Sequence, residues 1–211
     1  MTLVKICGLK TPEDVAMAVE AGANYLGFNF YPRSPRSISV ETAIELCSIV
    51  PPGICKVGLT VDMDDITLTE LMRVPLDMLQ LHGSETPERV TEVKEKYGLP
   101  VMKVVGIADA DDVAKLETYG AVADQLMVDA KPPRTGGLPG GNGLTFDWRL
   151  IADRHWPVPW MLAGGLTPDN VAEAIALTGV KQVDVASGVE SAPGVKDPEL
   201  VRAFIANAQD G

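Results

Sequence analysis

The chain has 211 residues, of which 46% are hydrophobic and 22% charged, a composition typical of a folded globular protein and not of a disordered or fibrous one. This length suffices for one well-buried core and is short for two, so we expect residues 1–211 to form a single domain. The net charge of −11 disfavours non-specific nucleic-acid binding, because such binding depends on neutralising phosphates. No apolar run approaches the ~18 residues of a membrane span, and the amino terminus lacks the features of a secretory signal.

The small number of cysteines and histidines limits the covalent and metal chemistry that we expect. Three cysteines do not form a disulfide framework, which together with the missing signal predicts a cytoplasmic location. His82 and His155 lie far apart in the sequence, and no CxxC or HExxH motif occurs. A metal site made of ligands close in sequence is therefore not expected.

Short apolar segments rich in Val, Ile and Leu alternate with amphipathic segments along the chain. Nearly continuous apolar character is typical of parallel strands that are covered on both faces. The predicted strands are residues 3–7, 24–30, 54–60, 77–81, 101–106, 125–129, 159–163 and 182–186. The predicted helices are residues 11–21, 40–48, 64–73, 86–96, 110–118, 146–154, 168–177 and 197–208.

A Thr-Pro pair starts three of these helices, at residues 11, 86 and 167, where threonine can cap and proline fits the first turn. Residues 8–22 (GLKTPEDVAMAVEAG) and 165–179 (GLTPDNVAEAIALTG) share this pattern, which indicates a repeated strand–helix unit. Eight such units predict an α/β protein with a closed (β/α)8 barrel, and a doubly wound open sheet is the main alternative. The Gly- and Pro-rich residues 132–143 are predicted to form a long loop after the sixth strand.

In a (β/α)8 barrel the active site lies at the carboxyl ends of the strands, and the last two loops commonly bind phosphate. Gly164 and Gly165 follow the seventh predicted strand, and Ser187 and Gly188 follow the eighth. Their backbone N–H groups would converge on an anion, although glycines in these places also serve simply to form tight turns. Because both pairs occur where the fold places a phosphate, we expect a phosphate site.

Two other strand ends carry groups suited to acid–base chemistry. Cys7 ends the first strand and as a thiolate would act as base or nucleophile, whereas Cys47 and Cys55 are interpreted as buried apolar residues. Asp129 ends the apolar sixth strand, where partial withdrawal from water favours a carboxyl that acts as general acid; alternatively it braces a loop. Together Cys7 and Asp129 would flank a substrate, as isomerisation without a cofactor requires.

Further charged side chains are candidates for ligand contacts. Arg36, after the second strand, carries a guanidinium suited to bidentate carboxylate binding, although a solvated loop arginine is commoner. His82, at the end of the fourth strand, is a candidate for the site, whereas His155 is predicted to lie on the surface. Lys5 would form a Schiff base with a carbonyl, but its place one layer below Cys7 favours a core role.

Several stretches, in order over nearly the whole chain, are similar to a single family. They are KICGL (5–9), DVAMAVEAGANYLGFNF (14–30), SPRSI (34–38), LDMLQLHG (76–83), FDW (146–148), LAGGLTPDNVAEAI (162–175) and DVASGVESAPGVKDPELVRAFI (184–205). With these stretches the chain resembles the phosphoribosylanthranilate isomerases, (β/α)8-barrel enzymes of tryptophan biosynthesis. Ser37, Thr60 and Asp62 depart from the usual family pattern, which leaves the loop contacts open.

The resemblance implies an Amadori rearrangement of N-(5-phosphoribosyl)anthranilate to 1-(2-carboxyphenylamino)-1-deoxyribulose 5-phosphate, with no metal or organic cofactor. By motif match, Cys7 would be the general base and Asp129 the general acid. Arg36 would hold the anthranilate carboxylate and His82 would assist. The loops after strands seven and eight would hold the phosphate.

Two other functions stay open on the sequence alone. One is a Schiff-base sugar-phosphate lyase that uses Lys5 or Lys103, and the other is a non-catalytic barrel that binds a sugar phosphate. In each case the ligand is a small phosphorylated molecule, and neither nucleic acid nor membrane is an expected partner. A homodimer is compatible with the family.

Overall fold

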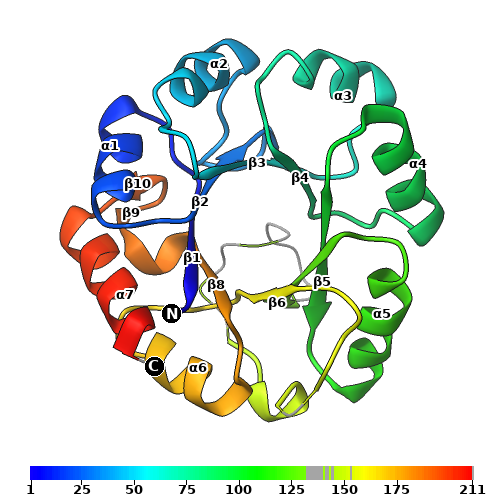
Figure 1. The fold of residues 1–211 in the computed structure, drawn as a ribbon, viewed down its shortest axis with the longest axis vertical. Coiled ribbons are helices and arrows are strands. Elements are labelled where there is room, and N and C mark those ends of the chain that lie inside the picture. The colour runs from blue at the N-terminus through cyan, green and yellow to red at the C-terminus, as the bar shows by residue number, and fades with distance from the viewer. Residues whose placement is uncertain (132–139, 141–142, 144, 153, 211) are drawn as a thin grey trace.

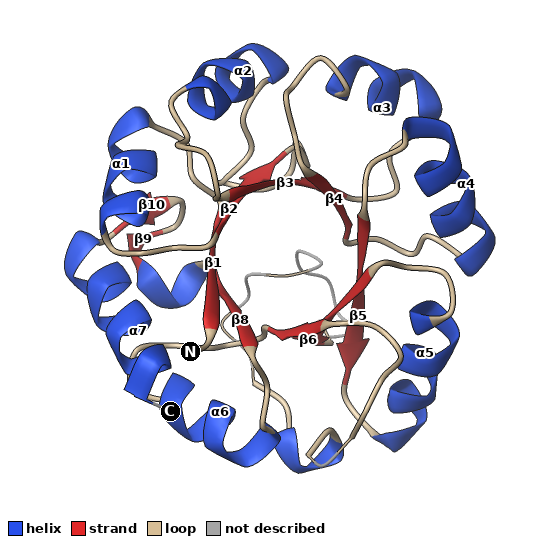
Figure 2. Cartoon of the chain, viewed as in Figure 1, coloured by secondary structure: helices blue, strands red, loops and turns tan. Residues whose placement is uncertain are grey.

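A closed barrel of eight parallel strands forms the centre of the molecule. The computed structural model describes residues 1–131, 140, 143, 145–152 and 154–210. The strands pair in chain order from first to eighth, and the eighth also pairs with the first (Figure 1). Helices surround the strands (Figure 2). The predicted (β/α)8 barrel is therefore confirmed, and the open-sheet alternative is wrong. The predicted loop 132–143 lies outside the described residues except for Gly140 and Gly143.

All eight predicted strands are present, with ends that coincide with the prediction or differ from it by one residue. They are β1 (Leu3–Cys7), β2 (Tyr25–Asn29), β3 (Cys55–Thr60), β4 (Met78–Leu81), β5 (Val101–Ile107), β6 (Gln125–Ala130), β7 (Trp160–Leu162) and β8 (Gln182–Val185). The helices in the described part of the chain are α1 (Pro12–Glu20), α2 (Val40–Ser48), α3 (Asp65–Leu71), α4 (Pro87–Tyr97), α5 (Ala110–Gly120), α6 (Val171–Thr178) and α7 (Pro198–Asp210).

Two of the three Thr-Pro pairs start a helix as predicted. The Thr11 side chain accepts the Asp14 N–H at 3.1 Å, and the Asp14 carboxylate accepts the Thr11 N–H at 3.3 Å, which makes a capping box for α1. Thr86 caps α4 by accepting the Arg89 N–H at 3.3 Å. These local hydrogen bonds explain why the starts of α1 and α4 could be found from sequence.

The third pair, Thr167-Pro168, does not start its helix. The side-chain oxygen of Asn170 accepts the Thr167 N–H at 2.8 Å, so these residues form a turn, and α6 begins only at Val171. The predicted helix start at residue 168 is therefore wrong. The residues that follow the pair explain the difference from α1. Glu13 and Asp14 follow Thr11-Pro12, whereas Asp169 and Asn170 follow Thr167-Pro168.

Two elements differ in kind from the prediction. The described part of segment 146–154 contains a 3-10 turn, η1 (Trp148–Leu150), instead of an α-helix, because Asp147 accepts the Arg149 N–H and closes a tight turn. After β8, the chain forms an antiparallel hairpin of β9 (Glu190–Ala192) and β10 (Val195–Lys196), which was not predicted. This hairpin lies outside the barrel, near α1 and α7 in Figure 1.

The strands bury side chains on both faces, as the alternation of a β-strand requires. The main core, which contains Phe28 and Phe204, lies between the strands and the helices. A smaller cluster made largely of Met102, Met127 and Met161 fills the barrel interior. Polar residues occupy other buried positions on the strands and pair there, as Gln125 does with Gln182 at 2.7 Å. The barrel centre is therefore packed and not an open channel.

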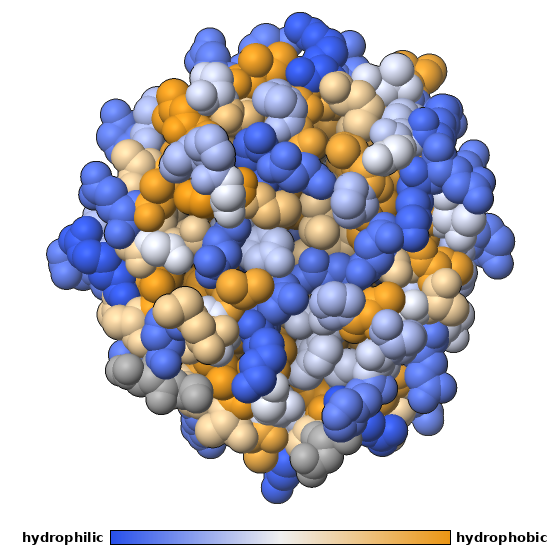
Figure 3. Space-filling view, in the orientation of Figure 1, coloured by the Kyte–Doolittle hydropathy of each residue, from blue (hydrophilic) through white to orange (hydrophobic). Residues whose placement is uncertain are grey.

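Hydrophilic side chains gather at the rim of the molecule, over the surrounding helices (Figure 3). This distribution accommodates the net charge of −11, because the charged residues of the helices remain in water. Among the described residues, no helix combines the length and the apolar character that crossing a bilayer demands.

Asp112, in the first turn of α5, connects this helix to the residue that follows β6. Its carboxylate accepts Lys115 Nζ at 2.7 Å, Lys131 Nζ at 2.9 Å and the Ala108 N–H at 3.1 Å. Burial raises the pKa of the Asp112 carboxyl, but these donors together lower it to about 2. The ionised carboxylate is therefore favoured in the folded state.

We expect Asp112→Asn to remove part of the dependence of stability on pH. The folded pKa of about 2 lies below the ordinary 3.8, so ionised Asp112 stabilises the fold above about pH 4, and this contribution disappears as the pH falls through 2. The variant should lose about 1–2 kcal/mol of unfolding free energy near neutral pH and much less near pH 2. Urea titrations at several pH values measure this, with the exposed neighbour Asp111→Asn as control. A loss that is the same at every pH would contradict the prediction.

Candidate active site

A pocket of about 780 Å³, which includes space open to solvent, lies at the carboxyl ends of the strands. Catalytic residues of (β/α)8 barrels lie at this end of the strands. All the residues predicted for the site line this one pocket: Cys7, Arg36, His82, Asp129, Gly164, Gly165, Ser187 and Gly188. The pocket is therefore the candidate active site.

Cys7 ends β1 beside a buried ammonium group. A β-carbon added at Gly27, on β2, would lie 2.8 Å from Cys7 Sγ and 3.1 Å from Lys5 Nζ, so the two side chains converge there. Lys5 is fully buried and donates to Asp184 Oδ1 at 2.7 Å. Burial raises the pKa of the Cys7 thiol, while the positive charges of Lys5 and Lys196 act to lower it. These cations favour the thiolate that a base would need.

Asp129, on β6, and His82, after β4, face each other in the pocket. His82 Nε2 lies 3.2 Å from Asp129 Oδ2, and Asp129 Oδ1 accepts the Ala130 N–H at 2.7 Å. On the other side of the imidazole, Gln80 Nε2 lies 3.2 Å from His82 Nδ1. A β-carbon added at Gly140 would lie 2.6 Å from His82 Cε1 and 2.8 Å from Asp129 Oδ2. Glycine at this position therefore lets the backbone lie directly over the His82–Asp129 pair.

Arg36 lines the pocket, but one edge of its guanidinium is already bound. Its Nε and Nη2 donate to the two carboxylate oxygens of Glu190, at 2.7 and 2.8 Å. Gly8, with φ of 84°, makes room for the arginine, since an added β-carbon there would lie 2.5 Å from Arg36 Cδ. Arg36 thus binds a carboxylate with two hydrogen bonds, as its chemistry predicted, but the carboxylate is that of Glu190, which leaves only the Nη1 side of the guanidinium for a ligand.

Glu190 and Lys196 lie behind Arg36 and support it, a role that the sequence did not reveal. They come from β9 and β10, and Lys196 Nζ donates to Glu190 Oε1 at 2.9 Å. Burial raises the pKa of the Glu190 carboxyl, but Arg36, Lys196 and the Gly194 N–H lower it to about 2. The Glu190 carboxylate thus stays ionised and holds Arg36 in place. The only signal for it was the stretch SGVE (187–190), which follows the last strand.

The loops after β7 and β8 lie together at one side of the pocket. Gly164 and Gly165 have φ of 83° and 65°, which glycine adopts without strain. An added β-carbon would lie 2.5 Å from Ala130 N at Gly164 and 1.9 Å from Leu166 O at Gly188. Both places therefore require glycine, and the close backbone approach suits an anion bound by N–H groups.

The remaining candidates lie outside this pocket. The amines of Lys5 and Lys103 are engaged by carboxylates, and neither residue lines it, which removes the basis for a Schiff-base lyase. Cys47 is buried as predicted, Cys55 is only partly buried, and His155 is exposed. Within the part of the chain that the structure describes, no cluster of His, Cys, Asp and Glu has the make-up of a metal site.

Residues 4–207 match the model of a protein family described as N-(5'phosphoribosyl)anthranilate (PRA) isomerase. Two similar proteins carry the name N-(5'-phosphoribosyl)anthranilate isomerase. The protein of Paracoccus denitrificans is 60% identical over 206 residues, which cover 97% of this chain and 96% of the relative. The protein of Cereibacter sphaeroides is 58% identical over 207 residues, which cover 98% of each chain.

Solved structures of phosphoribosylanthranilate isomerases show the same architecture. The Thermotoga maritima structure has a TM-score of 0.88 and 38% sequence identity, with full coverage of both chains. A second structure, in complex with reduced 1-(o-carboxyphenylamino)-1-deoxyribulose 5-phosphate, has a TM-score of 0.86 and 35% identity, again with full coverage.

We expect Glu190→Gln to destabilise the fold strongly. The substitution leaves the buried cations Arg36 and Lys196 without their shared carboxylate, a loss that costs about 3 kcal/mol in comparable buried pairs. Chemical denaturation measures the change. Glu199→Gln, which breaks an exposed pair with Arg202, is the matched control and should cost less than about 1 kcal/mol. Equal effects of the two substitutions would contradict the anchoring role of Glu190.

Proposed function

The chain belongs to the N-(5'-phosphoribosyl)anthranilate isomerase family, and from this premise we propose how its pocket performs the reaction. It is an isomerase of tryptophan biosynthesis that converts N-(5-phosphoribosyl)anthranilate into 1-(2-carboxyphenylamino)-1-deoxyribulose 5-phosphate, so its ligand is a small phosphorylated molecule. One observation supports the residue roles most: Cys7 and Asp129, from β1 and β6, line the same pocket.

Asp129 is the general acid in this proposal. It gives a proton to the ring oxygen of the ribose, the bond between that oxygen and the anomeric carbon breaks, and the nitrogen lone pair forms a protonated Schiff base. Oδ2 is the oxygen suited to this transfer, because Oδ1 is engaged by the Ala130 N–H, whereas Oδ2 lies beside His82. Asp129 is then left as a carboxylate.

Cys7 is the general base. Its thiolate removes the proton from the carbon that bears the 2-hydroxyl, and the electrons of that bond move to form an enolamine. The enolamine then tautomerises to the ketone. Because burial raises the pKa of the Cys7 thiol, the positive charges of Lys5 and Lys196 are what favour its ionisation.

The two anionic ends of the substrate are bound away from the reacting carbons. Arg36 takes the anthranilate carboxylate from its Nη1 side, held in place by Glu190. The backbone of Gly164 and Gly165 and of Ser187 and Gly188 binds the phosphate. Binding both ends fixes the ribose between acid and base, which converts binding energy into orientation.

We also propose that residues 1–211 form one catalytic domain that works in the cytoplasm. For the oligomeric state, the T. maritima relative is described as dimeric, which supports a homodimer for this chain. Sedimentation equilibrium distinguishes the two states, and a single species with the 22.5 kDa mass of one chain would overturn the dimer.

We expect Cys7→Ala and Asp129→Asn each to lower kcat by at least about a hundredfold, since each removes one proton-transfer group. The assay follows the loss of anthranilate fluorescence. Cys47→Ala, a buried cysteine of α2 outside the pocket, is the control and should retain activity. Because Cys7 has to be ionised and Asp129 protonated at the same time, wild-type kcat/KM should pass through a maximum and fall toward both low and high pH. Near wild-type turnover in either pocket variant would contradict its assigned role.

A further inference from the structure

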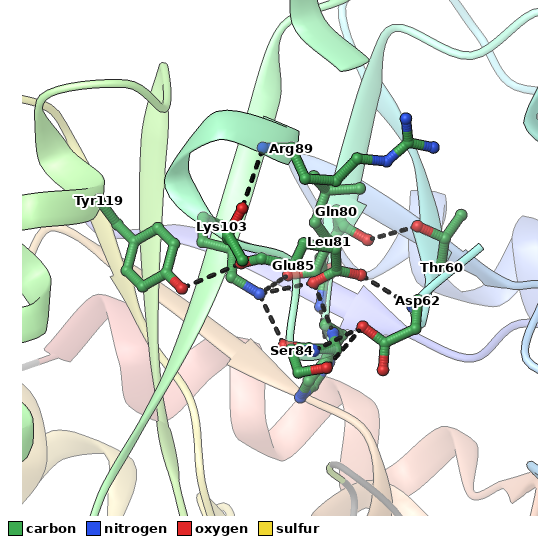
Figure 4. Close-up of polar contacts among 12 residues, drawn as sticks. Thr60, Asp62, Gln80, Leu81, Ser84, Glu85, Arg89, Lys103 and Tyr119 are labelled. Atoms are coloured by element: carbon green, nitrogen blue, oxygen red, sulfur yellow. Dashed lines mark hydrogen bonds and ion pairs between the residues drawn. The ribbon is translucent and has the colours of Figure 1, made fainter. Parts of the chain in front are cut away.

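A buried cluster of polar groups lies next to the pocket, under the loop that joins β4 to α4 (Figure 4). At its centre is Lys103 of β5, which is 2% exposed. Lys103 Nζ donates to Glu85 Oε2 at 2.6 Å, to Gly83 O at 2.7 Å and to Leu81 O at 3.3 Å. The two carbonyls belong to the residues on either side of His82. One ammonium group therefore holds the backbone on both sides of a residue that contacts Asp129.

Glu85 connects the 81–85 loop by hydrogen bonds to two other parts of the barrel. Its Oε2 accepts the Gly83 N–H, and its Oε1 accepts the Asp62 N–H from the loop after β3, both at 2.9 Å. The Tyr119 hydroxyl of α5 donates to Glu85 O at 2.9 Å. Glu85 thus connects its own loop to the preceding loop and to a helix.

The two loops fit together closely. Asp62 has φ of 46°, and its Oδ1 accepts the Ser84 N–H at 2.7 Å. A β-carbon added at Gly83 would lie 2.5 Å from Asp62 Oδ1. The His82 N–H also donates to Thr60 O at 2.9 Å, which continues the β3–β4 pairing. These contacts leave the backbone of His82 little freedom.

Stability alone is a poor explanation for a buried Lys103–Glu85 pair. Desolvation of two charges offsets most of their attraction, and well-packed apolar residues of similar size commonly serve stability as well or better. Lys103 alternates with the interior residues Met102 and Val104, so it projects to the helix side of β5, where Val101 and Val105 belong to the main apolar core. What the pair provides there is directional hydrogen bonding to the 81–85 loop.

The neighbours of the His82 ring determine which nitrogen carries its proton. Gln80 Nε2 faces both His82 Nδ1 and Met127 Sδ, and an amide nitrogen in this place donates, which favours the tautomer that accepts at Nδ1 and carries its hydrogen on Nε2. Nε2 lies 3.2 Å from Asp129 Oδ2, without the alignment of a hydrogen bond and with no other partner among the described residues. Such contacts commonly tighten when substrate is bound.

We propose that Lys103 and Glu85 are positioning residues for catalysis, which hold the 81–85 loop so that His82 presents Nε2–H to Asp129, while Gln80 selects that tautomer. The proposal rests on the assignment of Asp129 as the general acid. When Asp129 gives its proton to the ring oxygen, the carboxylate that remains accepts a hydrogen bond from His82 Nε2–H. The imidazole keeps its own proton throughout.

The proposal predicts a change in kcat and not in KM. The polar partners recorded for Lys103 and Glu85 in the described residues lie in the loops after β3 and β4 and in α5, away from Arg36 and the loops after β7 and β8, so ground-state binding should persist. Lys103→Met should lower kcat by about tenfold to a hundredfold, the cost expected for misplacing a group near the reaction. Lys56→Met, which breaks the Lys56–Asp77 pair near the opposite end of β3, is the matched control and should leave both constants unchanged.

The tautomer is measured by long-range ¹H–¹⁵N spectra, without any substrate. The chain has only two histidines, so His155→Gln assigns the ring signals. We expect the Nε2–H form for His82 in the wild type and mixed forms in Lys103→Met. Gln80→Glu should move the hydrogen to Nδ1, because a carboxylate there accepts it.

The two measurements separate this proposal from the assigned role of Asp129. If Asp129→Asn retained turnover while the His82 spectra behaved as expected, the acid assignment would be wrong and the positioning of His82 would stand. An unchanged tautomer and a kcat within twofold of the wild type in folded Lys103→Met would overturn the proposal. Should Lys103→Met not fold, Lys103→Met/Glu85→Met, which leaves no lone buried charge, is judged by the same two outcomes.

Discussion

The closure between β1 and β8 is the constraint on which the site depends. Lys5 and Asp184 are direct neighbours in the register of these strands, and their side chains form a 2.7 Å ion pair inside the barrel although 179 residues separate them. Cys7 follows two residues later on β1, and Ser187 and Gly188 follow β8. Closing the barrel therefore brings the thiol and the loop after β8 to the same pocket, with a buried cation beside the sulfur.

Most of the fold could be predicted because its signals are local. Apolar strands, helix caps and glycine turns are each encoded within a few residues, and so the strands and the starts of α1 and α4 were found from sequence. The predicted start of α6 was wrong because Asn170 stabilises a turn that competes with the helix. Segment 146–154 was wrongly predicted as an α-helix because Asp147 closes a tighter turn there. The pocket residues could be predicted because the active site of a (β/α)8 barrel lies at the carboxyl ends of its strands, so that polar residues at those ends became candidates.

The partners of those site residues could not be predicted, because they are set by tertiary contacts. Arg36 has an evident chemistry for carboxylates, but nothing near it in sequence indicates that Glu190, 154 residues away, occupies one edge of its guanidinium. Lys103 stands in an apolar strand, where its role depends on a loop from another strand. Around this pocket, Lys5, Arg36, Lys103 and Lys196 each pair with a carboxylate. In our proposal the ligand's phosphate is bound by backbone N–H groups, which carry no net charge.

The β9–β10 hairpin has a consequence for the order in which the protein is made. Synthesis proceeds from the amino terminus, so Arg36 leaves the ribosome long before Glu190 and Lys196 do. Until those last residues are available, the arginine has no carboxylate from the hairpin to orient it, and β1 has no β8 to pair with. The pocket is thus completed only with the final segment of the chain, and a nascent polypeptide that stops short of residue 190 carries Cys7 and Asp129 without the carboxylate that fixes Arg36 in the same pocket.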